Sequence, residues 1–306
     1  MKLDVKSKRA FKNNIIGYAF IFPQILGILV LVYFGTIFVS AVSFSNWNFY
    51  GGLTLKNFKF IGLTNFQYVL TNDRFMASII TNAFLVVMVP VTAFISLIAG
   101  KAINNKYFFE RGLRAVYFIP NICNIVAVVM LWTALFHPRL SPVSGMMSSM
   151  GITPPEWFSS PWNARIMLYL LTLWRSIGYC AFIYLGALNS IPRQLYEAAE
   201  IDGAGVITKF FKITFPLVSP TTFFIIITGI MSALKDWTSV LLLTNGGPGG
   251  STTVFGMLAY RFAFPEGGMN QDLGAASAVT VIMLIIAVVV TLVNWKFQDK
   301  WVNYNN

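Results

Sequence analysis

The chain has 306 residues, of which 56% are hydrophobic and 11% charged, whereas about 25% of the residues of a soluble domain are charged. This composition excludes an ordinary soluble protein and indicates that most of the chain lies in lipid. The net charge of +11 would suit a nucleic-acid-binding protein, but the apolar runs leave no soluble basic face. We therefore expect membrane lipid, and no nucleic acid, among its partners.

Neither the cysteines nor the histidine predict a metal site or a catalytic site. Cys123 and Cys180 fall in apolar runs without metal-ligand spacing, so we expect them to be buried free thiols. His137 is the only histidine, which gives little support to a histidine-based metal site or to a Ser-His-Asp triad. We expect neither a metal nor an enzymatic activity in this chain.

Six apolar runs are each long enough to cross a bilayer as a helix, which takes about 20 residues. In chain order, the predicted spans are residues 15–43, 75–100, 115–136, 164–188, 221–243 and 273–293. They leave a basic tail at residues 1–14, a transmembrane domain at 15–295 and a polar tail at 296–306. The first run is too long for the apolar part of a signal peptide, so we interpret it as a retained span. The predicted fold is an all-α integral membrane protein with six transmembrane helices.

The basic residues are distributed unevenly between the two sides that six spans define. One side holds the two tails and the loops 101–114 and 189–220, with 14 Lys and Arg: Lys2, Lys6, Lys8, Arg9, Lys12, Lys101, Lys106, Arg111, Arg114, Arg193, Lys209, Lys212, Lys296 and Lys300. The opposite loops hold 5: Lys56, Lys59, Arg74, Arg139 and Arg261. Because cytoplasmic loops carry the excess of Lys and Arg, both termini and the loop 189–220 are predicted to be cytoplasmic.

The loop 189–220 is a polar island between two apolar runs. Residues Arg193 to Asp202 are good helix formers, and Gly203 suits the end of that helix because glycine takes φ > 0 without steric cost. A second short helix is predicted from Val206 to Thr214, and Pro216 marks the return into the membrane. The loop is therefore expected to form a helical hairpin on the cytoplasmic side.

The same loop carries an extended motif, Glu197-Ala198-Ala199-x-x-Asp202-Gly203-Ala204, followed by Phe210-x-x-Ile213-x-x-Pro216. The motif resembles the EAA loop of permease subunits in binding-protein-dependent ABC importers. Its full form is similar to that of carbohydrate permeases for maltose, lactose, oligosaccharides and glycerol-3-phosphate. The resemblance implies a MetI-like core with a cytoplasmic coupling helix that docks on an ATPase subunit. The residues it assigns to this coupling are Glu197, Ala198, Ala199, Asp202, Gly203, Phe210 and Pro216.

The resemblance also implies an assembly of several subunits in the cytoplasmic membrane of a bacterium. The chain would form a heterodimer with a second permease subunit and would bind two ATPase subunits and an extracytoplasmic solute-binding protein. No Walker motif is present in this chain. ATP and Mg are therefore expected on the partner ATPase, with no cofactor in this chain. The implied function is the translocation of a sugar or oligosaccharide.

Polar residues inside the fourth and fifth spans are the candidates for a substrate pathway, since a charge in mid-membrane usually faces a cavity or a partner. They are Arg175, Ser176, Tyr179, Thr228, Ser232, Lys235, Asp236, Trp237 and Ser239. Lys235 and Asp236 are adjacent and cannot pair with each other on one helix, so Asp236 could pair with Arg175. An interhelical ion pair that fixes packing stays open as the structural alternative to a pathway.

Two other functions compete with that of an importer permease. A stand-alone secondary transporter or channel for a polar solute would explain the spans and the buried charges, but not the coupling loop. A six-span membrane enzyme is disfavoured, because the predicted spans contain no plausible His, Cys or clustered carboxylate site.

Overall fold

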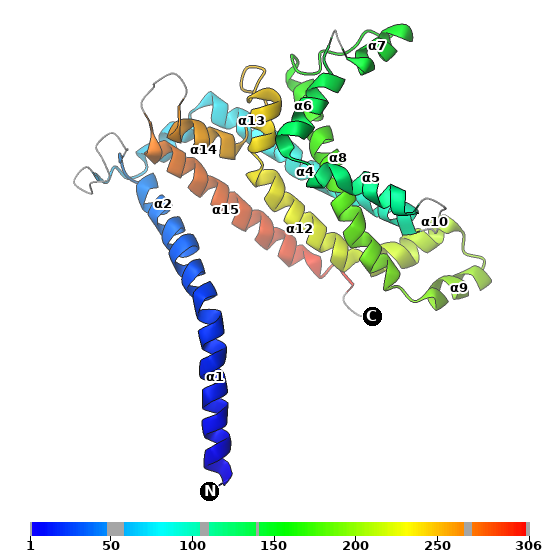
Figure 1. Ribbon diagram of the computed structural model, residues 1–306. Helices are drawn as coiled ribbons and strands as arrows, with labels where there is room; N and C mark the ends of the chain where they lie inside the picture. Colours follow the sequence, from blue (N-terminus) through cyan, green and yellow to red (C-terminus); the bar gives the residue numbers. More distant parts are fainter. Residues whose placement is uncertain (1, 48–57, 105–109, 139–140, 266–270, 304–306) are drawn as a thin grey trace.

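The computed structural model describes residues 2–47, 58–104, 110–138, 141–265 and 271–303 (Figure 1). Within these ranges the regular structure is helical, apart from one isolated bridge between Ser45 and Phe60. The elements are α1 (Lys2–Gly27), η1 (Ile28–Phe34), α2 (Gly35–Ser43), α3 (Thr64–Leu70), α4 (Asp73–Asn104), α5 (Glu110–Ile122), α6 (Ile125–Leu135), α7 (Pro142–Ser149), α8 (Pro161–Asn189), α9 (Arg193–Ile201), α10 (Val206–Lys209), η4 (Phe210–Thr214), α11 (Phe215–Leu217), α12 (Ser219–Lys235), α13 (Thr238–Thr244), α14 (Phe255–Ala263) and α15 (Leu273–Gln298), where η marks π-helical segments. The predicted all-α fold class is confirmed.

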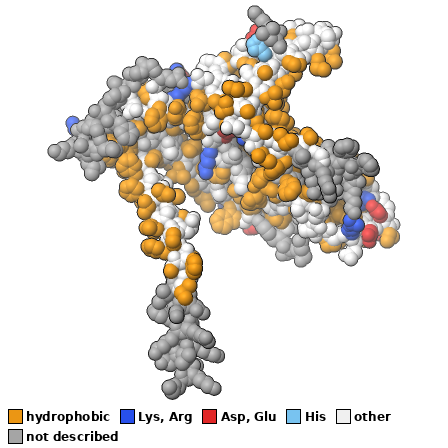
Figure 2. Space-filling model, in the orientation of Figure 1, with side chains coloured by type: hydrophobic (Ala, Val, Ile, Leu, Met, Phe, Trp, Pro, Cys, Tyr) orange, Lys and Arg blue, Asp and Glu red, His pale blue; other side chains and the backbone are white. Residues whose placement is uncertain are grey.

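Four helices are long and apolar enough to cross a membrane by themselves: Ile16–Ser43, Asp73–Asn104, Pro161–Asn189 and Leu273–Gln298. The predicted spans 75–100, 164–188 and 273–293 lie within three of them. Figure 2 shows hydrophobic side chains over much of the visible face, with charged side chains gathered at the end that carries α9. The apolar exterior is the one expected of a helical bundle in lipid.

The third predicted span, 115–136, is not one continuous helix. The chain bends by 116° between Val116–Ile122 and Ile125–Leu135. Asn124 has an extended backbone, and its side chain accepts a hydrogen bond of 2.9 Å from the N–H of Val126 at the start of α6. Hydropathy does not detect such a capping residue inside an apolar run. Cys123, expected to be buried, is exposed at this bend.

The fifth predicted span, 221–243, is also broken. Helix α12 ends at Lys235, and α13 begins at Thr238. The carboxylate of Asp236 accepts hydrogen bonds from the N–H of Ser239 at 3.1 Å and from its hydroxyl at 2.6 Å. A side chain that bonds the backbone ahead of it competes with helix continuation. The break therefore has a local cause in the pair Asp236 and Ser239.

Helices α4, α8, α12, α14 and α15 pack into a bundle (Figure 1). The small residues at the start of α15, from Gly274 to Ala278, are buried, as expected for closely packed helices. A Cβ atom at Gly274 would lie 2.5 Å from Nδ2 of Asn65, which donates to the carbonyls of Ser43 and Ser45. Helix α14 also contributes to the core, because its residues Phe255, Met257 and Leu258 are buried.

The N-terminal helix stands apart from this bundle (Figure 1). Helix α2 packs against α15, but α1 and η1 extend away from the core. In the most apolar 18-residue stretch of Ile16–Ser43, 6% of the residues are buried, whereas 33% are buried in the corresponding stretch of α4. The exposed apolar surface of this helix must face lipid or another subunit.

Candidate functional site

The loop 189–220 folds into a helical arm at the end of α8. Helix α9 ends where the sequence predicts, because Gly203 has φ +74°. The N–H of Gly203 donates to the carbonyl of Glu200 at 3.0 Å, and the N–H of Ala204 donates to that of Ala199 at 2.8 Å. This pair of bonds is a Schellman motif, which satisfies the last carbonyls of the helix. The predicted helix end at Gly203 is confirmed.

Side-chain contacts tie the second part of the arm to the first. The ammonium group of Lys209 lies 2.7 Å from Oε1 of Glu200. The hydroxyls of Tyr196 and Thr214 are hydrogen-bonded at 2.9 Å. Glu197 and Glu200 lie three residues apart on α9 and share a face, and among the described residues a salt-bridge partner is found for Glu200 alone of the two. Glu197 is exposed, and no described residue forms a salt bridge with it.

The predicted coupling residues divide into an exposed group and a supporting group. Glu197, Ala198, Asp202 and Gly203 are exposed on the arm, and Ala199 is half-buried. Phe210 and Pro216 are half-buried at its base. The ammonium group of Lys101 lies 4.9 Å from the centre of the Phe210 ring, so α4 contacts the arm.

Three large apolar side chains at the tip of the arm were not singled out from the sequence. Ile201, Val206 and Ile207 are 87%, 72% and 76% exposed. They flank the Gly203 turn on both sides. The sequence could have indicated them, because apolar residues stand on both sides of the polar Asp202-Gly203 turn. Together with Glu197 and Asp202, they give the arm an exposed surface that combines acidic and apolar side chains, which is suited to docking on another protein.

A cavity of about 220 Å³ lies between α4, α8 and α12. Five of the predicted pathway residues line it: Ser176 and Tyr179 from α8, and Thr228, Ser232 and Asp236 from α12 or its end. The cavity also has polar lining residues that were not predicted from the sequence: Thr92, Asn121, Tyr169 and Thr172. Thr172 lies four residues before Ser176, so helical spacing could have identified it. The wall is rich in hydroxyl groups.

The other four predicted pathway residues do not line this cavity. Arg175 and Asp236 form no ion pair, so the pairing suggested from the sequence is wrong. Asp236 bonds Ser239 instead, and Nε of Arg175 is buried without a hydrogen-bond partner. Ser239 is buried, and the Trp237 ring stacks on Tyr260 at 4.7 Å between ring centroids.

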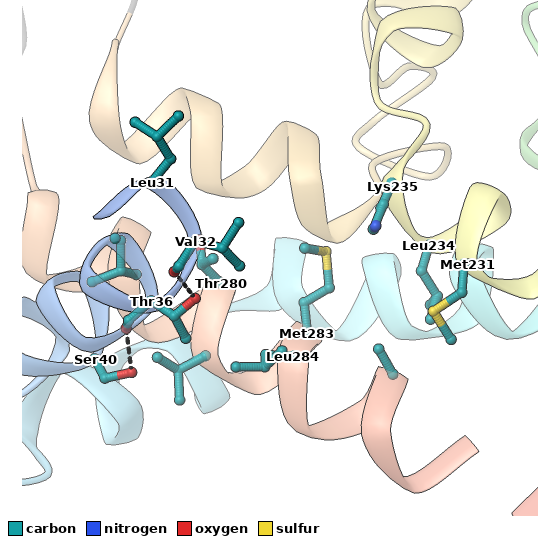
Figure 3. Close-up of a pocket in the computed structure, with 14 residues that line it drawn as sticks. Leu31, Val32, Thr36, Ser40, Met231, Leu234, Lys235, Thr280, Met283 and Leu284 are labelled. Atoms are coloured by element: carbon teal, nitrogen blue, oxygen red, sulfur yellow. Dashed lines mark hydrogen bonds between the residues drawn. The ribbon is translucent and has the colours of Figure 1, made fainter. Parts of the chain in front are cut away.

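Lys235 faces a separate groove of about 400 Å³ between the N-terminal helix, α12 and α15 (Figure 3). The hydroxyls of Thr36 and Ser40 in this groove bond carbonyls of their own helix. Lys235 is exposed and has no carboxylate partner among the described residues. Lys235 is the last residue of α12, and Asp236 follows it with a backbone outside the helical region, so the two side chains reach different spaces.

Comparison with known families identifies the type of protein. Residues 92–302 match the family model described as "Binding-protein-dependent transport system inner membrane component". The chain belongs to this family. Its matched part includes the arm, the helices from α5 to α15 and most of the residues that line the cavity, so the resemblance stated from the arm motif is confirmed.

This inner-membrane component has relatives along almost its full length. It is 31% identical to the "Probable ABC transporter permease protein YesP" of Bacillus subtilis over 98% of this chain and 96% of that protein. It is 28% identical to the "sn-glycerol-3-phosphate transport system permease protein UgpA" of Pectobacterium atrosepticum over 97% of this chain and 99% of that protein. A solved structure of a bacterial alginate ABC transporter, in complex with an alginate pentasaccharide-bound periplasmic protein, contains a chain of the same fold. That chain has a TM-score of 0.80 and is 20% identical, with coverage of 95% of this chain and 96% of the other.

Proposed function

We propose that this inner-membrane component is a permease subunit of an ATP-driven ABC importer that translocates a sugar or oligosaccharide. The observation that carries the proposal is the continuity between the arm and the cavity. The arm leaves α8 and returns through η4 and α11 to α12, the two helices that contribute most of the polar cavity wall. A displacement of the arm is therefore transmitted directly to the residues around the cavity.

The chemistry of the cavity supports a hydroxylated substrate. Hydroxyl groups of Ser, Thr and Tyr both donate and accept hydrogen bonds, as sugar hydroxyls do. Tyrosine rings also offer faces for the apolar side of a pyranose. Relatives of this chain include permeases named for arabinooligosaccharides and for sn-glycerol-3-phosphate. These names favour a sugar or sugar-like solute over an amino acid or an ion.

The proposed assembly has four kinds of component. This chain forms a heterodimer with a second permease subunit, and two ATPase subunits dock on the arms and bind ATP and Mg. An extracytoplasmic binding protein delivers the substrate at the opposite face. Both termini and the arm are cytoplasmic, in agreement with the excess of Lys and Arg on that side. Closure of the ATPases moves the arm, and the cavity changes its access from one face to the other.

An uptake experiment tests this function. Cells that lack the chain and cells that carry it are supplied with radiolabelled mono- and oligosaccharides, and accumulation is measured with and without depletion of ATP. We expect uptake of at least one saccharide that requires both the chain and ATP. ATP-independent accumulation would favour the stand-alone transporter, and accumulation of no saccharide would contradict the proposed substrate class.

A further inference from the structure

Three segments that are distant in the sequence meet at the carbonyl oxygen of Ser251. Arg165, in the first turns of α8, is 6% exposed, and its Nε donates to this oxygen at 3.0 Å. Thr81 of α4 donates to the same oxygen through its hydroxyl at 2.7 Å. The same Nε of Arg165 lies 3.3 Å from the Thr81 hydroxyl. We call these three residues the Ser251 latch.

The latch occupies the layer next to the cavity, on the side away from the arm. Thr81 lies four residues before Leu85 on α4, and Arg165 lies three residues before Leu168 on α8. Both leucines line the cavity. Residues three or four apart on a helix are one turn apart. The latch therefore closes the bundle one helical turn beyond the end of the cavity.

Ser251 belongs to a glycine-rich loop, residues 245–253, whose own hydrogen bonds hold it together with α13. The Thr252 hydroxyl donates to the carbonyl of Gly247 at 2.7 Å and bonds the hydroxyl of Thr244 at 2.7 Å. Val240 of α13 lines the cavity. Helix α13 and the loop thus form one unit that covers this end of the cavity.

The connection between this unit and α12 is not helical. Asp236 has φ −77° and ψ 88°, outside the helical region, and this break separates α12 from α13. Nearby, Arg261 holds the loop to α14 through the carbonyl of Asn245 at 2.8 Å. A helix break beside a latched loop allows the unit to turn at Asp236 once the latch opens.

Hydrogen bonds and one ring contact hold Arg165 in the latch. Among the described residues, no carboxylate pairs with Arg165. Its guanidinium group lies 4.8 Å above the Trp162 ring and is otherwise held by a carbonyl and a hydroxyl. Hydrogen bonds from a charged donor contribute more than neutral ones, and opening the latch separates Arg165 from a neutral carbonyl, so no buried carboxylate is left unpaired. Such an arrangement suits a contact that must open and close.

We propose that Arg165 is a positioning residue that keeps α13 and the 245–253 loop seated over the cavity, and that release of the Ser251 carbonyl opens this end. The proposal deepens the proposed function, because it rests on the cavity being the substrate pathway. It assigns the Ser251 latch to the face opposite the arm, where the binding protein would deliver its substrate.

The native cysteines provide the assay. The chain has 2 cysteines, and Cys180 lines the cavity whereas Cys123 lies outside it. In the assembled transporter with Cys123→Ser, a membrane-impermeant methanethiosulfonate reagent is applied to vesicles of each orientation, and the rate of Cys180 modification is measured. The variants are Arg165→Ala, Arg165→Lys and Thr81→Val. Lys59→Ala, an exposed basic residue outside the latch, is the matched control.

We expect Arg165→Ala to raise the rate of Cys180 modification from the loop side about tenfold, the effect of losing the hydrogen bonds of a charged donor. Thr81→Val and Arg165→Lys should give smaller increases, and Lys59→Ala none. Modification from the arm side should not rise. An equal rise from both sides would overturn the proposal, because it would indicate a loosened bundle. Unchanged rates in assembled variants would overturn it as well.

If Arg165→Ala does not assemble, Thr81→Val and Arg165→Lys decide the question by the same criteria. Sugar uptake by the Cys123→Ser parent separates the two proposals. Latch-dependent labelling in a parent that takes up no saccharide would support the latch and contradict the pathway. Uptake with latch-independent labelling would contradict the latch alone.

Discussion

At the residue scale, the cavity shows which polar positions helical spacing can reveal. Ser176 and Tyr179 lie three residues apart on one face of α8, and both line the cavity. Arg175, a candidate because of its charge inside a span, does not line the cavity. Asp236 lines it, but its contacts could not be derived from hydropathy. The helix break that reorients its carboxylate depends on Ser239 three residues later, a short-range signal inside an apolar run.

Asp236 has two separable roles that substitution can distinguish. Asp236→Asn keeps an oxygen that can accept from the N–H of Ser239 but removes the charge at the cavity. We expect this variant to assemble normally and to take up substrate poorly. Asp236→Ala also removes the bond to the Ser239 N–H, which costs about 1 kcal/mol at a helix start. Gel filtration of the purified complex should precede the uptake measurement for both variants.

Lys235 is the matched control for this prediction, because it is the neighbouring charge and faces the groove instead of the cavity. Lys235→Met should leave the KM for uptake unchanged, whereas Asp236→Asn should raise it. Normal uptake by Asp236→Asn would show that the charge of Asp236 is not needed for transport and that the residue only caps the start of α13. An equal rise in KM for both variants would place the pathway in the groove.

At the element scale, the arm was the most predictable part of the molecule, and the broken spans were the least. The arm is specified by local signals: good helix formers, a glycine stop and a return proline. The breaks after α5 and α12 depend on the side chains of Asn124 and Asp236, which accept from the backbone of the helix that follows, inside runs that stay apolar on average. Packing of α13 against α6 and α8 then fixes the broken geometry, and a single sequence does not specify that packing.

Gly203 tests whether the shape of the arm matters for docking. Its φ of +74° is a conformation that costs a residue with a side chain about 1–2 kcal/mol. Gly203→Val should distort the turn, leave the membrane helices intact and weaken co-purification of the ATPase. Gly205→Ala is the control, since Gly205 has φ −69° and open space around its Cα. If equal amounts of ATPase co-purify with both variants, the Gly203 turn is not part of the coupling interface.

The two glutamates of α9 are expected to differ. Glu200 pairs with Lys209 inside the arm, and exposed pairs of this kind contribute little stability, so Glu200→Gln should change ATPase binding only slightly. Glu197 is exposed without such a partner. Glu197→Lys should uncouple ATP hydrolysis from uptake while the permease stays in the membrane. ATPase activity and uptake measured in the same vesicles would show the uncoupling. Coupled transport by Glu197→Lys would contradict a docking role.

At the scale of the whole molecule, the orientation of the bundle follows from charge, and the position of the N-terminal helix does not follow from the sequence at all. Local patterns cannot show whether a span packs against its own chain, because that depends on partners. The distribution of Lys and Arg, in contrast, is a property of the loops alone. It predicts that the arm and both tails share the cytoplasmic side.

Cysteine labelling from outside the cell checks this orientation. In a background without native cysteines, Ser148→Cys in α7 should react with an impermeant maleimide, and Lys6→Cys should react only after the cells are opened. The opposite pattern would reverse the orientation and place the arm where no cytoplasmic ATPase could reach it. Reaction of both positions in intact cells would contradict the predicted topology, in which three spans, an odd number, separate position 6 from position 148.

The isolated position of α1 and η1 has a consequence for biogenesis. A helix that buries so few of its apolar residues against its own chain gains almost no stability from intramolecular packing after membrane insertion. Such a helix is stable alone in lipid, but its final neighbours must arrive by lateral association. We therefore expect the subunit, when synthesised without the rest of its transporter, to insert fully and yet be removed by membrane proteases. Coordinated synthesis of the other components would then determine how much of it accumulates in the cell.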